Sequence, residues 1–169
     1  MDMSQRPLPC AVLEGANLDG QIMSQTKLTR ANLHRAHLQN TSLDHVDLAR
    51  ADLGHASIES STLESTDLGR ADLTQASLRQ STLESVNLRR ANLQGADLTG
   101  VSIGESDFRH TDLRGANFAG ARILDTSLGG ARLDGANLSG VSWENDVCPD
   151  GTKTAADNDT CAGHLTAKG

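Results

Sequence analysis

Residues 71–100 read ADLTQ ASLRQ STLES VNLRR ANLQG ADLTG, a run of five-residue blocks that share one pattern. The third residue of each block is Leu, the first is small or β-branched, and the last two are polar or Gly. In both directions from this stretch an apolar residue recurs at every fifth position, from Leu13 to Trp143, without an insertion. Self-similarity at a fixed period is the sequence signature of a repeat architecture.

The apolar third positions predict a continuous core. A period of five matches neither the 3.6-residue stripe of a helix nor the two-residue alternation of a free strand, but it suits a chain that turns a corner after every short strand. We expect the following residues to form a structural ladder inside the molecule: Leu33, Leu38, Leu43, Leu48, Leu53, Leu63, Leu68, Leu73, Leu93, Phe108, Phe118 and Trp143.

The sequence also has a second, longer period of four blocks. The first positions run Ala71, Ala76, Ser81 and Val86, and then Ala91, Ala96, Val101 and Ser106. Four blocks therefore form one unit, as expected if each block makes one side of a four-sided coil.

The repeated A-(D/N)-L-x-x pattern, as in Ala51-Asp52-Leu53 and Ala91-Asn92-Leu93, resembles the pentapeptide repeat family. The resemblance implies an all-β fold, a right-handed quadrilateral parallel β-helix with the central Leu or Phe and the small residue pointing inward. Over residues 11–145 we expect nearly seven coils and a rod roughly 30 Å long, at about 4.8 Å per coil. Residues 1–10 are expected to form an N-terminal cap, and residues 146–169 a C-terminal cap and polar tail.

Composition limits the function. The chain has 169 residues and a formal net charge of -7, which argues against direct nucleic-acid binding, since that usually needs a basic excess. No apolar run approaches the roughly 18 residues of a membrane helix, so no membrane association is expected. Residues 1–10 contain no apolar stretch like that of a signal peptide. The chain is expected to be cytoplasmic if it is complete, and periplasmic or exported if a signal peptide has been removed.

The cysteines bear on whether the chain is cytoplasmic or exported. Cys148 and Cys161 flank a short loop beyond the last repeat, and a disulfide between them would indicate an oxidising compartment. Two metal sites are weaker alternatives. Cys148, Cys161 and His164 would supply only three zinc ligands, and the oxygen-rich residues Asp150, Asp157, Asn158 and Asp159 do not match a calcium loop. We therefore expect no metal and no cofactor.

Two charged columns emerge when the repeats are stacked four blocks at a time. Arg30, Arg50, Arg70 and Arg90 align on one edge, continued by His110. They are candidates for binding an anion, although charge pairing with Asp52, Asp72 and Asp112 is the simpler and preferred explanation. Asp44, Glu64 and Glu84 form a candidate acidic edge, with Glu144 farther along.

No catalytic constellation is visible. The histidines at positions 34, 37, 45, 55 and 110 fall on different edges, without the spacing of a triad or a nucleotide-binding motif. The preferred hypothesis is a non-enzymatic module whose flat faces dock an unidentified protein, as a monomer or a weak end-to-end dimer. The alternative follows from the resemblance, because some family members protect type II topoisomerases and have been viewed as DNA mimics. On that hypothesis the partner is DNA gyrase.

Overall fold

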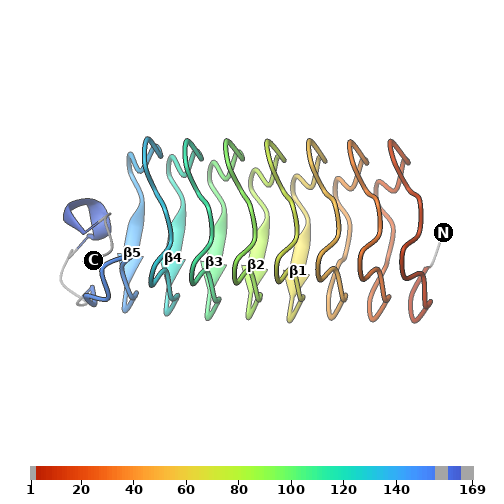
Figure 1. The fold of residues 1–169 in the computed structure, drawn as a ribbon, viewed down its shortest axis with the longest axis horizontal. Coiled ribbons are helices and arrows are strands. Elements are labelled where there is room, and N and C mark those ends of the chain that lie inside the picture. Colours follow the sequence, from red (N-terminus) through yellow and green to blue (C-terminus); the bar gives the residue numbers. More distant parts are fainter. Residues whose placement is uncertain (1–2, 155–159, 165–169) are drawn as a thin grey trace.

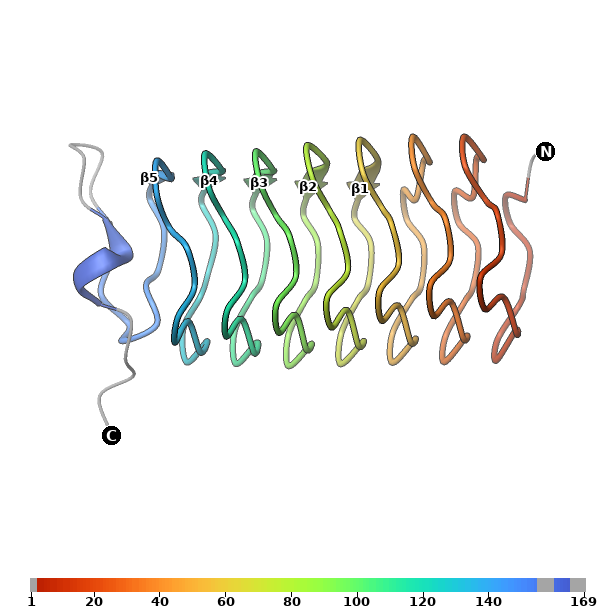
Figure 2. The ribbon, with the colours of Figure 1, turned by 90° about the horizontal axis from the view of Figure 1, so that it is seen from above.

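The computed structural model describes residues 3–154 and 160–164 and shows a rod of stacked four-sided coils (Figures 1 and 2). This confirms the predicted all-β parallel β-helix. Five short strands lie side by side along one face: β1 (Thr62–Glu64), β2 (Thr82–Glu84), β3 (Ser102–Gly104), β4 (Arg122–Leu124) and β5 (Ser142–Glu144). Among the described residues no helix is long and apolar enough to cross a membrane.

Every coil pairs with the next at an interval of four repeats. The strands are parallel and in register, so that Leu63 lies opposite Leu83 and Glu64 opposite Glu84. The other three sides are held by single parallel bridges with the same step, such as Asp67 to Asn87. We call the side that carries β1–β5 face 1. Faces 2, 3 and 4 follow it along the chain and contain Leu68, Leu73 and Leu78 respectively.

The core is the ladder that the five-residue period predicts. Most central residues from Leu18 to Leu133 are buried, and Phe108 and Phe118 are the largest fully buried side chains. Small first-position residues fill the space between them, and their hydroxyl groups remain hydrogen-bonded. Ser61 Oγ, for example, donates to the Leu38 carbonyl at 2.7 Å, and Ser81 Oγ to the Ile58 carbonyl at 2.7 Å. A narrow core of this kind has little room for aromatic rings, consistent with an aromatic content of 2%.

The corners depend on one backbone conformation. The fifth residue of the repeats has φ near +60°, whether it is Gly, as at Gly95 (φ 68), or another residue, as at Arg70 (φ 60) and Gln75 (φ 55). This left-handed conformation is readily adopted by Gly and costs other residues energy. The side chain at each corner points away from the core, which explains why polar residues occur there.

The N-terminal boundary predicted at residue 11 is too late. Pro7 already bridges to Lys27, and the Leu8 N–H donates to the Lys27 carbonyl at 2.8 Å. Leu8 is in phase with the ladder, since it lies one repeat before Leu13. Pro7 is tolerated because its missing N–H would point away from the rod, as at the edge of a sheet. Stacking on face 2 therefore begins within the predicted cap.

The boundary at residue 145 is also too early. Val147 still pairs with Ser127 in the parallel stack and pairs with Lys153 in the antiparallel direction. The chain then folds over the last coil, where the short helix η1 (Cys161–Gly163) lies beyond β5 (Figure 1). The C-terminal end of the rod is thus covered, whereas nothing within the described residues covers the first coil at the other end.

Candidate functional site

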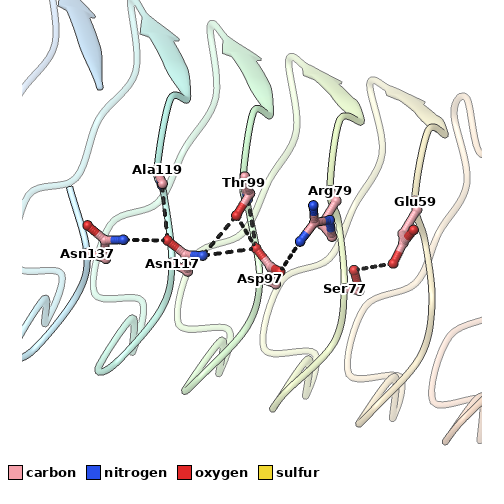
Figure 3. Close-up of polar contacts among 8 residues, drawn as sticks. All are labelled: Glu59, Ser77, Arg79, Asp97, Thr99, Asn117, Ala119 and Asn137. Atoms are coloured by element: carbon pink, nitrogen blue, oxygen red, sulfur yellow. Dashed lines mark hydrogen bonds and ion pairs between the residues drawn. The ribbon is translucent and has the colours of Figure 1, made fainter. Parts of the chain in front are cut away.

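Most polar side chains on face 4 bind one another along the rod (Figure 3). Asn137 Nδ2 donates to Asn117 Oδ1 at 2.9 Å, and Asn117 Nδ2 donates to Thr99 Oγ1 at 2.9 Å. Thr99 and Arg79 both donate to Asp97. Burial raises the pKa of Asp97, but these hydrogen bonds outweigh that effect and hold the pKa below its usual value. The polar groups of face 4 are thus largely used by the fold.

The carboxylates of face 3 are also occupied. Asp112 accepts hydrogen bonds from the Arg114 guanidinium (Nε to Oδ1, 2.8 Å), which lower the pKa of that carboxyl group. Asp72 accepts from the N–H and hydroxyl groups of Thr74, and Asp52 lies 3.4 Å from His34 Nδ1. These three carboxylates were expected to neutralise the arginine column, and that expectation is wrong. Each instead contacts a residue on its own face.

The arginine column therefore stands without neutralising partners. Among the described residues, Arg30, Arg50, Arg70 and Arg90 form no ion pair or side-chain hydrogen bond. All four side chains are exposed at the corner between faces 2 and 3. Arg50, Arg70 and Arg90 line an open hollow of about 370 Å³ on face 2, together with Arg89, which was not predicted. Arg89 lies one residue before the column and could have been found by comparing adjacent positions.

The acidic column lies on face 1. Asp44, Glu64 and Glu84 line a second open hollow of about 310 Å³. Asp44 accepts a hydrogen bond from Ser42 Oγ at 2.6 Å. Glu64 and Glu84 are exposed and make no side-chain hydrogen bond or ion pair within the described part of the chain. Two of the three predicted acidic residues are thus free to contact another molecule.

The acidic column is longer than predicted. The positions in register with Glu84 on β3 and β4 are not acidic, but each is followed by an exposed acidic corner residue, Glu105 or Asp125. Glu144 on β5 then resumes the original position. Acidic side chains therefore continue over every coil from Asp44 to Glu144. Glu105 and Asp125 were not predicted because stacking whole units compares only equivalent repeat positions, and these two residues lie one residue off register.

One basic side chain shares this face at its C-terminal end. Arg122 on β4 is exposed, and its guanidinium group lies 3.9 Å from the Glu144 carboxylate. It partly neutralises the end of the column, whereas Glu64 and Glu84 in the middle have no ion-pair partner among the described residues.

Three features mark the C-terminal cap. Cys148 and Cys161 form a disulfide with a Cα–Cα distance of 5.3 Å, so neither thiol is available for the zinc site considered above. His164 Nδ1 lies 3.0 Å from Asp150 Oδ2. Asp150, the described member of the calcium alternative, also accepts from Thr152, which lowers its pKa to about 2. The other members of that alternative, Asp157, Asn158 and Asp159, lie outside the described residues.

The structure brings two of the five predicted histidines together. His34 and His55 meet edge to face with ring centroids 5.4 Å apart, and His34 also contacts Asp52 on face 3. His37, His45 and His110 are exposed on other parts of the rod. Within the described residues, the two hollows above are open depressions in the surface, and neither contains a histidine.

Comparisons with known proteins agree with this geometry. The sequence matches the family model of pentapeptide repeats. The match comprises eight copies of the repeat, over residues 8–43, 26–64, 66–103 and 104–140. No curated protein matches the sequence. Among solved structures, a trypsin-treated variant of QnrB1, a plasmid-mediated fluoroquinolone resistance protein, has a TM-score of 0.62 at 20% identity and covers 86% of this chain and 84% of its own.

A second similar structure is the pentapeptide repeat protein alr5209 from Nostoc Pcc 7120. It has a TM-score of 0.52 at 29% identity, covering 60% of this chain and 84% of its own. The five-residue ladder, the four-sided coils and the match over most of the sequence lead to one conclusion: this chain belongs to the pentapeptide repeat family.

Proposed function

We propose that this chain is a non-enzymatic interaction module that docks a protein partner through face 1. The observation that carries the proposal is the column of acidic side chains that continues over successive coils from Asp44 to Glu144. Glu64 and Glu84 in the middle of it have no neutralising side chain among the described residues. A partner with a basic surface would supply the missing charge, and such complementarity gives specificity and fast association.

The geometry of face 1 suits docking better than catalysis. Adjacent coils repeat at about 4.8 Å, and the strands β1–β5 hold the exposed side chains in fixed rows. A convex rod of this kind offers no deep apolar pocket of the sort that usually holds a small substrate. The exposed Thr62 and Thr82 lie beside the acids and would contribute neutral hydrogen bonds to the same partner.

Site-specific photo-crosslinking in the protein's own host tests this proposal. A photoreactive residue in place of Thr82 on face 1 should give a discrete crosslinked protein. The same residue in place of Gln94 on face 3, which is also exposed, is the matched control and should not. Addition of E64Q and E84Q should abolish the crosslink at position 82. Crosslinks of equal yield from both faces, or none from face 1, would contradict the proposal.

A second candidate is a DNA-mimicking regulator or protector of DNA gyrase. Two observations favour it: the extended acidic column, which a DNA-binding groove would accept, and the likeness in fold to a fluoroquinolone resistance protein. The Cys148–Cys161 disulfide weighs against it, because such bonds are rare in the reducing cytosol where gyrase acts. The general interaction module therefore remains the preferred proposal.

A gyrase supercoiling assay across a protein titration, with and without a fluoroquinolone, separates the two candidates. A gyrase regulator should inhibit supercoiling or protect the enzyme at micromolar protein or below, and E64Q/E84Q should lose the effect. E14Q/D134N removes the same charge from face 3 and should retain it. Absence of any effect at high concentration would reject the gyrase candidate and leave the interaction module.

A further inference from the structure

The hollow on face 2 is formed by a local change in side-chain size. Ala49 and Gly69 lie in successive coils at the same repeat position and form its floor, while Arg50, Arg70 and Arg90 line it at the corner. A Cβ atom at Gly69 would lie 3.0 Å from Asp67 Oδ1 and 3.1 Å from Asn87 Nδ2. The surface is therefore recessed at Ala49 and Gly69 because these two positions carry almost no side chain.

The charge in this hollow is not balanced. Its one carboxylate, Asp67, accepts hydrogen bonds from the neutral groups Asn87 Nδ2 and Gly69 N, both at 2.8 Å. Arg89 Nε is 3.8 Å from Asp107, a carboxylate that Arg109 already binds at 2.8 Å. The hollow is thus lined by four arginines, of which only Arg89 has an ion-pair partner, and by one carboxylate that none of them pairs with, in a protein whose formal net charge is -7.

The arginines at the corner are also unfavourable for the backbone. Arg50, Arg70 and Arg90 have φ of 61, 60 and 58°. For an L-residue other than Gly, Asn or Asp, this conformation costs roughly 1 kcal/mol or more. The equivalent corner one face away is made by His55 and Gln75 in two of the same coils and by Gly95 in the third. Within the described residues, no ion pair explains why Arg50, Arg70 and Arg90 recur at this edge.

We propose that this hollow binds an oligophosphate, with two or three linked phosphate groups lying along the rod axis. Guanidinium groups favour phosphate because their paired N–H donors match two of its oxygens. Arg50 to Arg90 spans two coil spacings, about 9.6 Å, and the long arginine side chains can converge on linked phosphates that are spaced more closely than the coils. The floor of Ala49 and Gly69 lets the ligand approach the backbone closely.

Isothermal titration calorimetry with inorganic tripolyphosphate at low salt tests the site. The protein should bind it saturably, and R70N should weaken binding about tenfold, the loss expected for one charge-assisted hydrogen-bonding group. Asn tolerates positive φ, so R70N should unfold at the same temperature as the parent or a higher one. R35N is the matched control: Arg35 has φ of 57° and is also exposed, but it lies at a different corner.

Further ligands identify the source of the phosphate. ATP binding as tightly as tripolyphosphate would indicate a nucleoside triphosphate, and weaker ATP binding would indicate a free oligophosphate; both support the site if R70N reduces them. The proposal is overturned if tripolyphosphate does not bind, if R35N weakens it as much as R70N, or if orthophosphate binds equally well. It is also overturned if a single-stranded oligonucleotide binds through Arg70 while tripolyphosphate does not.

Discussion

Asp146 shows what one residue does when the repeat places it in the core. It occupies the first position of a repeat, in the same column as Ser106 and Thr126, and it is fully buried. Its carboxylate accepts hydrogen bonds from the backbone N–H groups of Thr126 at 2.8 Å and Glu144 at 2.9 Å. Burial nevertheless dominates and raises the pKa of Asp146 to about 6. The repeat thus ends on a carboxylate that is costly to ionise.

This pKa predicts a gain in stability on mild acidification. Because the pKa of Asp146 is about 6 in the folded protein and 3.8 as a model value, the folded state takes up a proton first as the pH falls. The free energy of unfolding should therefore rise by about 1 kcal/mol between pH 7 and pH 5. Trp143 is the only Trp and lies in the last coil, so its fluorescence during urea unfolding reports on this region.

The D146N variant is the control for that experiment, since it removes the titrating group and keeps one hydrogen-bond acceptor. Its stability should change much less between pH 7 and pH 5. Asp97, Asp112 and Asp150 have lowered pKa values, so their contribution to stability is complete above about pH 4 and is lost only as the pH falls below it. If D146N gained as much stability as the parent protein, the dependence would have to come from another group.

At the scale of the element, rows of hydrogen-bonded side chains on each face link successive coils. On face 4, Asn117 both donates and accepts: it donates to Thr99, and its oxygen accepts from Asn137 Nδ2 and from the Ala119 N–H. Its Nδ2 also lies 3.4 Å from Asp97 Oδ1. The amide therefore links Asp97 and Thr99 in the coil before it to Asn137 in the coil after it.

Replacement of Asn117 by Asp should break this ladder because it introduces a negative charge. N117D would place a carboxylate beside Asp97 and remove two donated hydrogen bonds, at a cost of about 1–2 kcal/mol at pH 7. The cost should be smaller near pH 3, where the new carboxyl group is protonated. N117S is the control, because Ser77 already occupies an equivalent position on this face. Equal destabilisation by the two variants in urea unfolding would argue against the role of charge.

The C-terminal cap is a second element, and its disulfide closes a segment with a sequence separation of 13. Constraining a loop of this size in the unfolded chain stabilises the native state by roughly 3 kcal/mol on the entropic model. C148A/C161A should therefore lower the Trp143 unfolding midpoint, whereas C10A should not, since Cys10 is a free, exposed thiol. Intact mass of the native protein after alkylation should show one modified thiol; three would show that the bond is absent.

At the scale of the whole molecule, the two ends of the rod differ. The C-terminal coil is covered by the segment that contains η1, whereas the first coil at the N-terminal end presents an open edge in the part of the chain that the structure describes (Figure 2). Val12 and Ile22, both exposed large hydrophobic residues, lie near this open end. An uncovered edge with unpaired backbone N–H and C=O groups can add another chain, but only two open ends can meet.

This asymmetry predicts the limit of self-association. Because the described residues leave one end of the rod open, association should stop at an end-to-end dimer and should not produce filaments. Sedimentation velocity over a wide concentration range should show a monomer converting to an elongated dimer. V12E/I22E should shift that equilibrium toward the monomer, while the same charge added by T62E/T82E at the middle of the rod should not. Species larger than a dimer would contradict the prediction.

The sequence alone determined the architecture. Leu33, Leu38 and the other third-position residues recur at a constant interval, and each repeat is a local unit whose inward and outward residues are set by the covalent spacing. The same spacing places Arg50 and Arg70 on one edge and Glu64 on another. It also implies that Leu8 continues the ladder, although the boundary predicted at residue 11 did not use it.

Only the tertiary structure decided which charges are neutralised. Arg70 could have paired with Asp72, two residues away, but Asp72 binds Thr74 instead. Such choices depend on side-chain directions at a corner and on neighbours one coil away, which a sequence interval does not specify. The same reason explains why Glu105 and Asp125 were found to extend the acidic column only in the structure. The backbone repeat is set locally, whereas the free charges on its surface result from competition among coils.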